Sequence, residues 1–438
     1  MAISNTGLEQ LIRSSPAPQA AAMRLERLCA DRKTQQGLSA LDTPLLKDLV
    51  SIIAISNFLF HFICRHPYAI SLIGQISSPE ESQVEAITDI NALRIYKYEE
   101  LLKITWMDVS GTCDYAEVLA ALSRLAVTIV RHALRLSLNA TSYDIVSNSM
   151  CVMGLGKLGA NELNYSSDID LIFISADPDN GDEHFPATHR LLSDSIRGLS
   201  RILEEKTEEG FLYRVDLKLR PWGRSGPLVM SIDDTEIYYE SSSESWERFA
   251  WLRARVIAGS KALGSELLQR MRPFIFMRSL STDDLGRFLE IKKAMSEARQ
   301  RQAHWNVKVG DGGIRDIEFF VQILQIVNAA RHKSLQTTNT LEAMAGLLST
   351  GLITAEEERE IYRSYLFLRR LENHLQMFDE QQTHDLPDEK NQRLILARSL
   401  GAAGHSNDAV LDNFEKELSA HRSTARMYFD RVLPGENL

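Results

Sequence analysis

Two signals of different chemistry share the stretch MGLGKLGANELNYSSDIDLIF, residues 153–173. Its glycines match the G-x-G-x-x-G turn that holds a dinucleotide, and Asp168 and Asp170 follow as an Asp-x-Asp pair. A dinucleotide fold needs a crossover of a dozen or more residues between the glycine turn and the next parallel strand. Residues 160–167 supply only eight. The spacing therefore favours the carboxylate pair, rather than the glycines, as the chemical site.

The carboxylate pair lies on an expected strand. Residues i and i+2 of a strand point to the same face, about 7 Å apart along the chain. Asp168 and Asp170 therefore project together, while Ile169 and Leu171 project to the other face. Two carboxylates so close repel each other unless a cation lies between them. Mg²⁺ is the natural cation, because it binds one or two carboxylates together with substrate phosphates.

A third acid stands on the next expected strand, FLYRVDLKLRP, residues 211–221. Apolar residues alternate there with a polar set that contains Asp216, Lys218 and Arg220. Lys218 and Arg220 thus share a face with Asp216, where they would meet phosphate oxygens. The other interpretation of these two cations is an ordinary solvated strand face.

Together these residues predict a metal-dependent phosphoryl site. Asp168, Asp170 and Asp216 are the predicted catalytic residues and the predicted ligands of Mg²⁺, since carboxylates on neighbouring strands can clamp metal ions for in-line displacement at phosphorus. An Asp-x-Asp at a strand end can also be no more than a solvated turn. The order of glycine turn, Asp-x-Asp strand and third acid favours the catalytic interpretation.

The elements that must position this site change character along the chain. Residues 43–139 show helical periodicity, short β-type segments begin near Ser147, and helical periodicity returns from Leu285 to the end. Between the β-type segments the pattern predicts a helix over 189–209, and a further helix over 245–257. The sequence therefore predicts an α+β core flanked by helical regions.

Composition limits the class of protein. The 438 residues carry a net charge of −10, which argues against nucleic acid as a partner because phosphate binding needs a basic surface. The apolar run Leu49–Cys64 is too short to cross a membrane and contains polar residues, so we expect a buried helix there. Four scattered cysteines and an N-terminus without a signal-peptide core indicate a reducing, cytoplasmic location.

Two further segments each allow two interpretations. In VGDGGIRDIEFF, residues 309–320, the glycines precede a helix whose amino end could bind an anion with help from Lys308 and Arg315, or they form a plain turn with Asp311 as the helix cap. The second segment is the expected helix 245–257, whose charged residues either lie at the site or form structural ion pairs: Glu247, Arg248 and Arg255. The spacing of His332, His374 and His384 matches no metal-ligand pattern, so surface or core positions are expected for them.

The glycine turn and the three acids together resemble the nucleotidyltransferase superfamily of the polymerase β type. Its fingerprint is a glycine-containing turn followed about ten residues later by Asp-x-Asp and then by a third Asp. The turn here is Gly156-Lys157, where the superfamily usually has Gly-Ser. The resemblance implies that Gly156 and Lys157 help to bind the nucleotide phosphates, with backbone N–H groups of residues 156–158 in the place of a serine hydroxyl.

Five ordered motifs resemble the glutamine synthetase adenylyltransferase family in particular. They are GLGKLGANELNYSSDIDLIF, YRVDLKLRPWGRSGPLV, WERFAWLRARVIAG, VKVGDGGIRDIEFFVQ and QTHDLP, and the resemblance extends from about Asn91 to Pro387. It implies a polymerase β-like domain with a small mixed sheet at residues 141–275, an N-terminal helical region at 1–140 and a C-terminal helical bundle at 276–438.

The order of these parts is similar to the N-terminal half of that family's bifunctional enzymes. The resemblance implies deadenylylation: phosphate attacks the adenylyl group on a tyrosine of glutamine synthetase, and ADP leaves. It also implies Mg²⁺ as cofactor, and adenylylated glutamine synthetase, phosphate or ADP, and the nitrogen regulatory PII protein as partners. Forward adenylyl transfer from ATP and a purely regulatory docking role are the alternatives.

Overall fold

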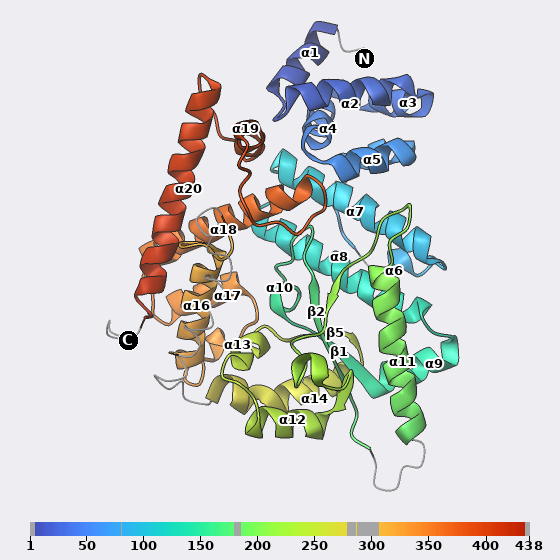
Figure 1. Cartoon of the computed structure of the whole chain (residues 1–438), viewed down its shortest axis with the longest axis vertical. Coiled ribbons are helices and arrows are strands. Elements are labelled where there is room, and N and C mark those ends of the chain that lie inside the picture. The colour runs from blue at the N-terminus through green and yellow to red at the C-terminus, as the bar shows by residue number, and fades with distance from the viewer. Residues whose placement is uncertain (1–4, 80, 179–184, 278–285, 287–305, 434–438) are drawn as a thin grey trace.

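The computed structural model describes residues 5–79, 81–178, 185–277, 286 and 306–433. The first part of the chain is helical (Figure 1). The long helices α7 and α8 pack on each other, and α8 also packs against the sheet. Gly111 ends α7 in a left-handed conformation with φ of 66°. The helices are α1 (Asn5–Ser14), α2 (Pro18–Ala30), α3 (Arg32–Ala40), α4 (Thr43–Ile55), α5 (Asn57–Arg65), α6 (Glu81–Val84), α7 (Ile90–Ser110), α8 (Tyr115–Leu136) and α9 (Ala140–Ser149).

A small mixed sheet follows. Its central strands β1 and β2 are antiparallel, β5 adds to the free edge of β1, and β3 and β4 both pair parallel to β2, one after the other along the same edge. The strands are β1 (Met150–Gly154), β2 (Ile169–Ser175), β3 (Val215–Asp216), β4 (Val229–Ser231) and β5 (Arg255–Gly259). Because β1 and β2 run antiparallel, the glycine turn between them is not a dinucleotide-binding crossover.

The remaining helices lie within and after the sheet segment. They are the short α10 (Gly156–Gly159), then α11 (Phe185–Glu204), α12 (Ile232–Ser241), α13 (Glu247–Trp251), α14 (Lys261–Arg272), α16 (Ile314–Asn328), α17 (Thr340–Ser349), α18 (Ala355–Met377), α19 (Lys390–Ser399) and α20 (Asn407–Asp430). A capping box of Thr354 and Glu357 starts α18. Helix α16, α17, α18 and α20 pack on one another at the end of the chain (Figure 1).

The sheet separates two apolar cores. Alternate residues of β2 point to opposite faces, so Ile169 and Leu171 enter a core shared with the N-terminal helices, whereas Ile172 and Ile174 enter a core shared with α12, α14 and the C-terminal helices. Each core draws on residues from both sides of an expected domain boundary, at 140 or at 275. The three-part division itself stays a prediction.

Several expected elements were wrong in extent or type. The strand expected over 211–220 is only Val215–Asp216, because the chain turns after Asp216. The helix expected over 245–257 is the short α13 followed by strand β5, which pairs with β1. The helix expected over 189–209 is α11, which ends at Glu204. Part of the helical pattern expected after Leu285 lies outside the described residues.

The apolar run Leu49–Cys64 forms two helices, not one. Helices α4 and α5 meet at Ser56 with a bend of 116°, and their apolar side chains are buried in the first core. Over the described ranges no single helix is long and apolar enough to span a membrane, although this bent pair passes by length and composition together.

Candidate active site

Asp170 and Asp216 lie side by side on neighbouring strands. They are partners in the parallel register of β2 and β3, and neighbouring strands are about 4.8 Å apart with paired side chains on one face. Burial, together with the charges of Asp216 and Asp168, raises the pKa of Asp170 to about 6, while Lys308 and Lys218 act in the opposite direction. The pair is thus a concentration of negative charge that is only partly compensated by the protein.

The other two predicted acids already contact cations. Asp168, one residue before β2, accepts a hydrogen bond of 2.6 Å from Nε of Arg214. Asp216 accepts one of 2.5 Å from Nζ of Lys218 and a second of 2.8 Å from the Lys218 backbone N–H. Both pairs are partly exposed, so we expect them to open for a ligand at little cost. Arg214 is a site residue that the sequence analysis missed.

Gly156 leaves room for the carboxylate of Asp170. Its φ of 54° lies in the left-handed region, and a Cβ added to it would come 2.3 Å from Oδ2 of Asp170. The described residues supply no acceptor for the N–H groups of Gly156, Lys157 and Leu158, which begin the one-turn helix α10. Phosphate binding by these N–H groups stays a prediction.

Substitution of Gly156 by alanine tests the contact with Asp170. We expect a fall in activity of about 10²-fold, since the new methyl group would displace the carboxylate from its place, together with a loss of stability of about 1 kcal/mol from the left-handed backbone. Gly111→Ala is the matched control, because Gly111 has φ of 66° and open space around an added Cβ. If both variants keep full activity, the close approach of Gly156 to Asp170 has no functional importance.

A buried polar stripe on α18 holds the loop between the glycine turn and Asp168. Arg369 donates hydrogen bonds to the Glu162 carbonyl and to Oδ1 of Asn164, the latter at 2.5 Å. Asn373 accepts from the Tyr165 N–H at 3.3 Å. Gln376 accepts from the Ser166 N–H at 2.9 Å. The three side chains on α18 are completely buried, so the loop that delivers Asp168 and Asp170 is fixed by a helix about 200 residues further along the chain.

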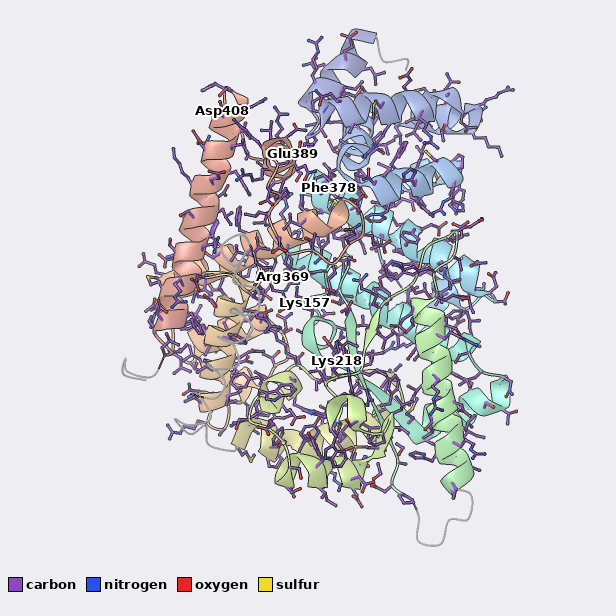
Figure 2. The ribbon with its side chains drawn as sticks, viewed as in Figure 1. Lys157, Lys218, Arg369, Phe378, Glu389 and Asp408 are labelled. Carbon is purple, nitrogen blue, oxygen red and sulfur yellow. The ribbon has the colours of Figure 1, made fainter. Side chains whose placement is uncertain are left out.

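Lys157 also takes part in the contact between the glycine turn and α18. Its Nζ lies 2.7 and 2.6 Å from the two carboxylate oxygens of Glu372 on α18, and Nδ1 of His384 lies 2.9 Å from one of them. Burial lowers the pKa of Lys157 to about 7 against the opposing effect of Glu372. Figure 2 shows Lys157 near Arg369, where α10 meets α18. Lys157 therefore anchors the glycine turn in this structure, and its predicted contact with phosphate is untested.

Lys308 approaches the carboxylates from the C-terminal region. Burial lowers its pKa, whereas Glu372, Glu318 and Asp170 raise it. Within the described part of the chain its ammonium group has no hydrogen-bond partner. Lys308 therefore lies within electrostatic range of Asp170 and of Glu372, and its contact with a substrate anion is a prediction.

The glycine turn before α16 is a plain turn. The backbone N–H of Gly312 binds Oδ2 of Asp316, and the next N–H groups bind carbonyls of the same turn. An added Cβ on Gly312 would lie 2.1 Å from the Arg422 carbonyl on α20. The expected cap, Asp311, instead pairs with Arg426 at 3.3 Å. Of the two interpretations of this segment, the structure favours the plain turn, although Asp311 does not cap the helix.

Other candidate residues have structural contacts. Arg220 donates to carbonyls of its own loop, those of Leu217, Arg224 and Gly226, at 2.8–3.2 Å, so the structure shows it stabilising the turn, and phosphate binding by Arg220 is untested. Arg255 on β5 donates to the Leu158 carbonyl at 2.9 Å and so supports the glycine turn.

The histidines and the first residues of α13 are also accounted for. His374 is buried next to Asp108, and His384 is partly buried next to Glu372. His332 is also partly buried. Glu247 accepts hydrogen bonds from the Tyr238 hydroxyl, and Arg248 donates to the Ile275 carbonyl.

The acids suit Mg²⁺ as a pair. Across the residues that the structure describes, no group of three His, Cys, Asp or Glu side chains is placed to hold a metal ion. Mg²⁺ needs only one or two carboxylates when substrate phosphates and water complete its shell. Asp170 and Asp216, in register on neighbouring strands, supply two carboxylates, and Mg²⁺ binding by this pair stays a prediction. Ligation by Asp168 as well stays a prediction.

The fold and the placement of the acids define the class of protein. An α+β domain with a small mixed sheet, in which a glycine turn precedes an Asp-x-Asp strand beside a third Asp, is a nucleotidyltransferase domain with flanking helical regions. A family model described as glutamate-ammonia ligase adenylyltransferase matches residues 46–270. This match covers more than half of the chain, which therefore belongs to that family. A second family model, GlnD PII-uridylyltransferase, matches residues 287–433.

Curated relatives agree with this family. The chain is 37% identical over 376 residues to the bifunctional glutamine synthetase adenylyltransferase/adenylyl-removing enzyme of Thioalkalivibrio sulfidiphilus, covering 82% of this chain and 38% of that protein. Proteins of the same description from Nitrosococcus oceani and Stenotrophomonas maltophilia are 35% and 34% identical over 87% and 85% of this chain and 40% and 42% of their own lengths. The chain thus spans about two fifths of these relatives.

Proposed function

We propose that this protein removes AMP from a tyrosine of glutamine synthetase by phosphorolysis. The observation that carries the proposal is the register pair Asp170 and Asp216, with Lys218 bound to Asp216 and with Lys308 in electrostatic range of Asp170. Carboxylates for a metal ion and cations for phosphate oxygens are the groups that phosphoryl transfer requires, because its catalysis consists mainly of positioning and charge neutralisation. Membership of the adenylyltransferase family supports glutamine synthetase as the protein substrate.

In the proposed reaction an oxygen of phosphate attacks the adenylyl phosphorus. The bond from phosphorus to the tyrosine oxygen breaks, tyrosine leaves and takes up a proton, and ADP forms. Asp170 and Asp216 would hold Mg²⁺, which supplies charge stabilisation at the reacting phosphates. Lys308 and Lys218 would reduce the repulsion between the two anionic reactants. The order of helical region, catalytic domain and helical bundle, similar to the N-terminal half of the family's enzymes, favours this direction over forward transfer.

One experiment distinguishes the two directions. Adenylylated glutamine synthetase, Mg²⁺ and phosphate are incubated with the protein, and ADP is measured. In parallel, unmodified glutamine synthetase is incubated with labelled ATP, and protein-bound AMP is measured. ADP in the first reaction without label in the second supports phosphorolysis, while the reverse result identifies forward transfer. Absence of both products contradicts an enzymatic role and favours the regulatory docking alternative.

Removal of divalent cations should stop either reaction. We expect EDTA to reduce the rate by about 10³-fold or more, since the acids would then face the phosphates without a cation, and we expect added Mg²⁺ to restore it. The rate of ADP formation at constant ionic strength is the measurement. A rate that EDTA leaves unchanged would contradict metal binding at Asp170 and Asp216.

The C-terminal helical region suggests a regulatory partner. Residues 287–433 match a family model named for PII-uridylyltransferase, and we propose that this region contacts a PII-type protein. Binding of a purified PII protein to the full chain, measured by calorimetry, tests this proposal. Hydrogen exchange of the full chain, with and without the PII protein, then locates the contact. Protection that lies only outside residues 287–433 would exclude the region.

A further inference from the structure

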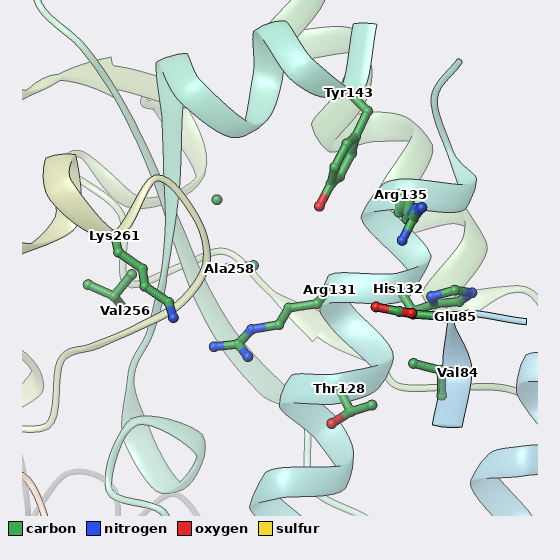
Figure 3. Close-up of a pocket in the computed structure, with 11 residues that line it drawn as sticks. Val84, Glu85, Thr128, Arg131, His132, Arg135, Tyr143, Val256, Ala258 and Lys261 are labelled. Atoms are coloured by element: carbon green, nitrogen blue, oxygen red, sulfur yellow. The ribbon is translucent and has the colours of Figure 1, made fainter. Parts of the chain in front are cut away.

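A pocket of about 210 Å³ lies at the edge of the sheet formed by β5 (Figure 3), and Asp170 is not among the residues that line it. Its walls come from α6, α8, α9, β5 and the start of α14. Figure 3 shows Arg131, Lys261 and Tyr143 pointing into the same space from three different elements. The lining residues are Val84, Glu85, Thr128, Arg131, His132, Arg135, Tyr143, Val256, Ala258, Gly259 and Lys261.

The charge of this pocket is opposite to that of the whole chain. Three cationic side chains, Arg131, Arg135 and Lys261, line it with a single carboxylate, Glu85, although the protein carries a net charge of −10. Among the described residues, Arg135 and Lys261 are exposed side chains without an ion-pair partner. Like charges that line one pocket repel each other, so an anion between Arg135 and Lys261 would lower the energy of the pocket.

The fold holds one of these cations, Arg131, in place. Nε of Arg131 donates a hydrogen bond of 2.6 Å to the Ile257 carbonyl on β5, which fixes the guanidinium at the pocket. Lys261 is the first residue of α14, whose amino end favours negative charge. Burial lowers the pKa of Arg255, and the positive charge of Arg131 lowers it further. Positive charge therefore accumulates on both sides of β5.

The geometry points to a binding site for a small dianion that bridges α8 and β5. Its volume is below the range of about 300–1,000 Å³ that is usual for drug-sized ligands, so the occupant is a phosphate-sized group or a short dicarboxylate. Arg131, Arg135 and Lys261 would bind the charged ends, and the Tyr143 hydroxyl would donate to a further oxygen. The aliphatic carbons of Val84, Val256 and Ala258 would contact the remainder.

Isothermal calorimetry with the full chain tests this site. Sodium sulfate and sodium glutarate are titrated separately, each at the same ionic strength in sodium chloride. The double variant Arg135→Gln/Lys261→Gln should bind the preferred ligand about tenfold more weakly or worse, because it loses two charge-assisted contacts. Both side chains are exposed, so the variant should fold, and its thermal midpoint without ligand verifies this.

The matched control is Arg32→Gln/Lys33→Gln, which removes the same two charges from exposed positions outside the pocket. It should bind like the parent protein. Preferential binding of sulfate identifies a phosphate-type ligand, and preferential binding of glutarate identifies a dicarboxylate. The pocket variant would still bind any sulfate that binds at the Asp170 site. Only the sulfate binding that the parent protein shows and the pocket variant lacks is therefore assigned to the pocket. Equal binding of both ligands to the parent and the pocket variant, or no binding to either, overturns the inference.

Discussion

Replacing Asp170 with asparagine is expected to abolish AMP removal, with a fall in rate of about 10³-fold or more. The reason is that Mg²⁺ would lose one of the two carboxylates proposed to hold it. The same substitution should stabilise the fold. The pKa of Asp170 is raised from 3.8 to about 6, so the folded protein holds a charged carboxylate above pH 6 at a cost that the unfolded chain does not have. Asparagine removes that cost, which is about 1–3 kcal/mol for a shift of this size.

The pH dependence checks the cause of the stabilisation. A carboxyl group whose folded pKa is raised binds more protons in the folded state between pH 3.8 and 6, so its destabilising effect is complete above about pH 6 and absent below about pH 3.8. The free energy of unfolding that Asp170→Asn gains should therefore increase from about pH 3.8 to about pH 6. Urea unfolding with EDTA present measures this gain. Asp412→Asn, an exposed acid on α20, should change neither rate nor stability. Loss of activity without any gain in stability would contradict the electrostatic account.

Glu372→Gln is expected to destabilise the protein by about 3–5 kcal/mol, the usual effect of removing one partner of a buried ion pair. Burial would raise the pKa of Glu372, but Lys157 and the other cations hold it well below the usual value. The neutral amide would leave Lys157 and Arg369 buried without this counter-charge. Urea unfolding measures the loss.

Two companion variants make this result specific. Glu356→Gln, on the exposed side of the same helix, should change stability by no more than about 0.5 kcal/mol. The double variant Lys157→Met/Glu372→Gln should recover much of the loss, since neither charge then remains buried alone. A double variant whose loss equals the sum of the two single losses would show that Lys157 and Glu372 do not stabilise the glycine turn together.

The sequence predicted the neighbouring positions of Asp170 and Asp216 better than it predicted the elements that support them. Asp168, Asp170 and Asp216 could be selected because strand alternation and carboxylate chemistry are local properties, and the structure does place Asp170 beside Asp216. The extent of the third strand could not be predicted, because Arg220 turns back to bind carbonyls of its own loop. Alternation of residue types continues past Asp216 although the pairing with β2 does not.

Strand β5 is a second feature that the sequence pattern did not predict. Residues 255–259 read as the end of a helix, yet they pair with β1, about 100 residues earlier in the chain. Pairing at a sheet edge is a long-range contact, and an apolar run of this length does not distinguish a helix from a strand. Only the assembled sheet shows that Arg255 reaches the Leu158 carbonyl from that edge.

The buried position of the polar stripe on α18 is a third feature that the sequence pattern did not predict. Arg369, Glu372, Asn373 and Gln376 recur at helical spacing, a pattern typical of the exposed side of an amphipathic helix. In the structure all four are completely buried. Their partners are charged groups and free backbone groups of residues 157–166, which no periodicity within α18 could indicate.

The sheet with a core on each face limits how this protein can be dissected. A fragment of residues 141–275 would contain every predicted catalytic acid, but it would expose Leu171 on one surface and Ile172 on the other to water. It would also lack the helix that braces the loop before Asp168. The smallest autonomous unit that keeps the chemistry is therefore much larger than the stretch that performs it, and shortening the chain from either end should cause aggregation before it causes a change in specificity.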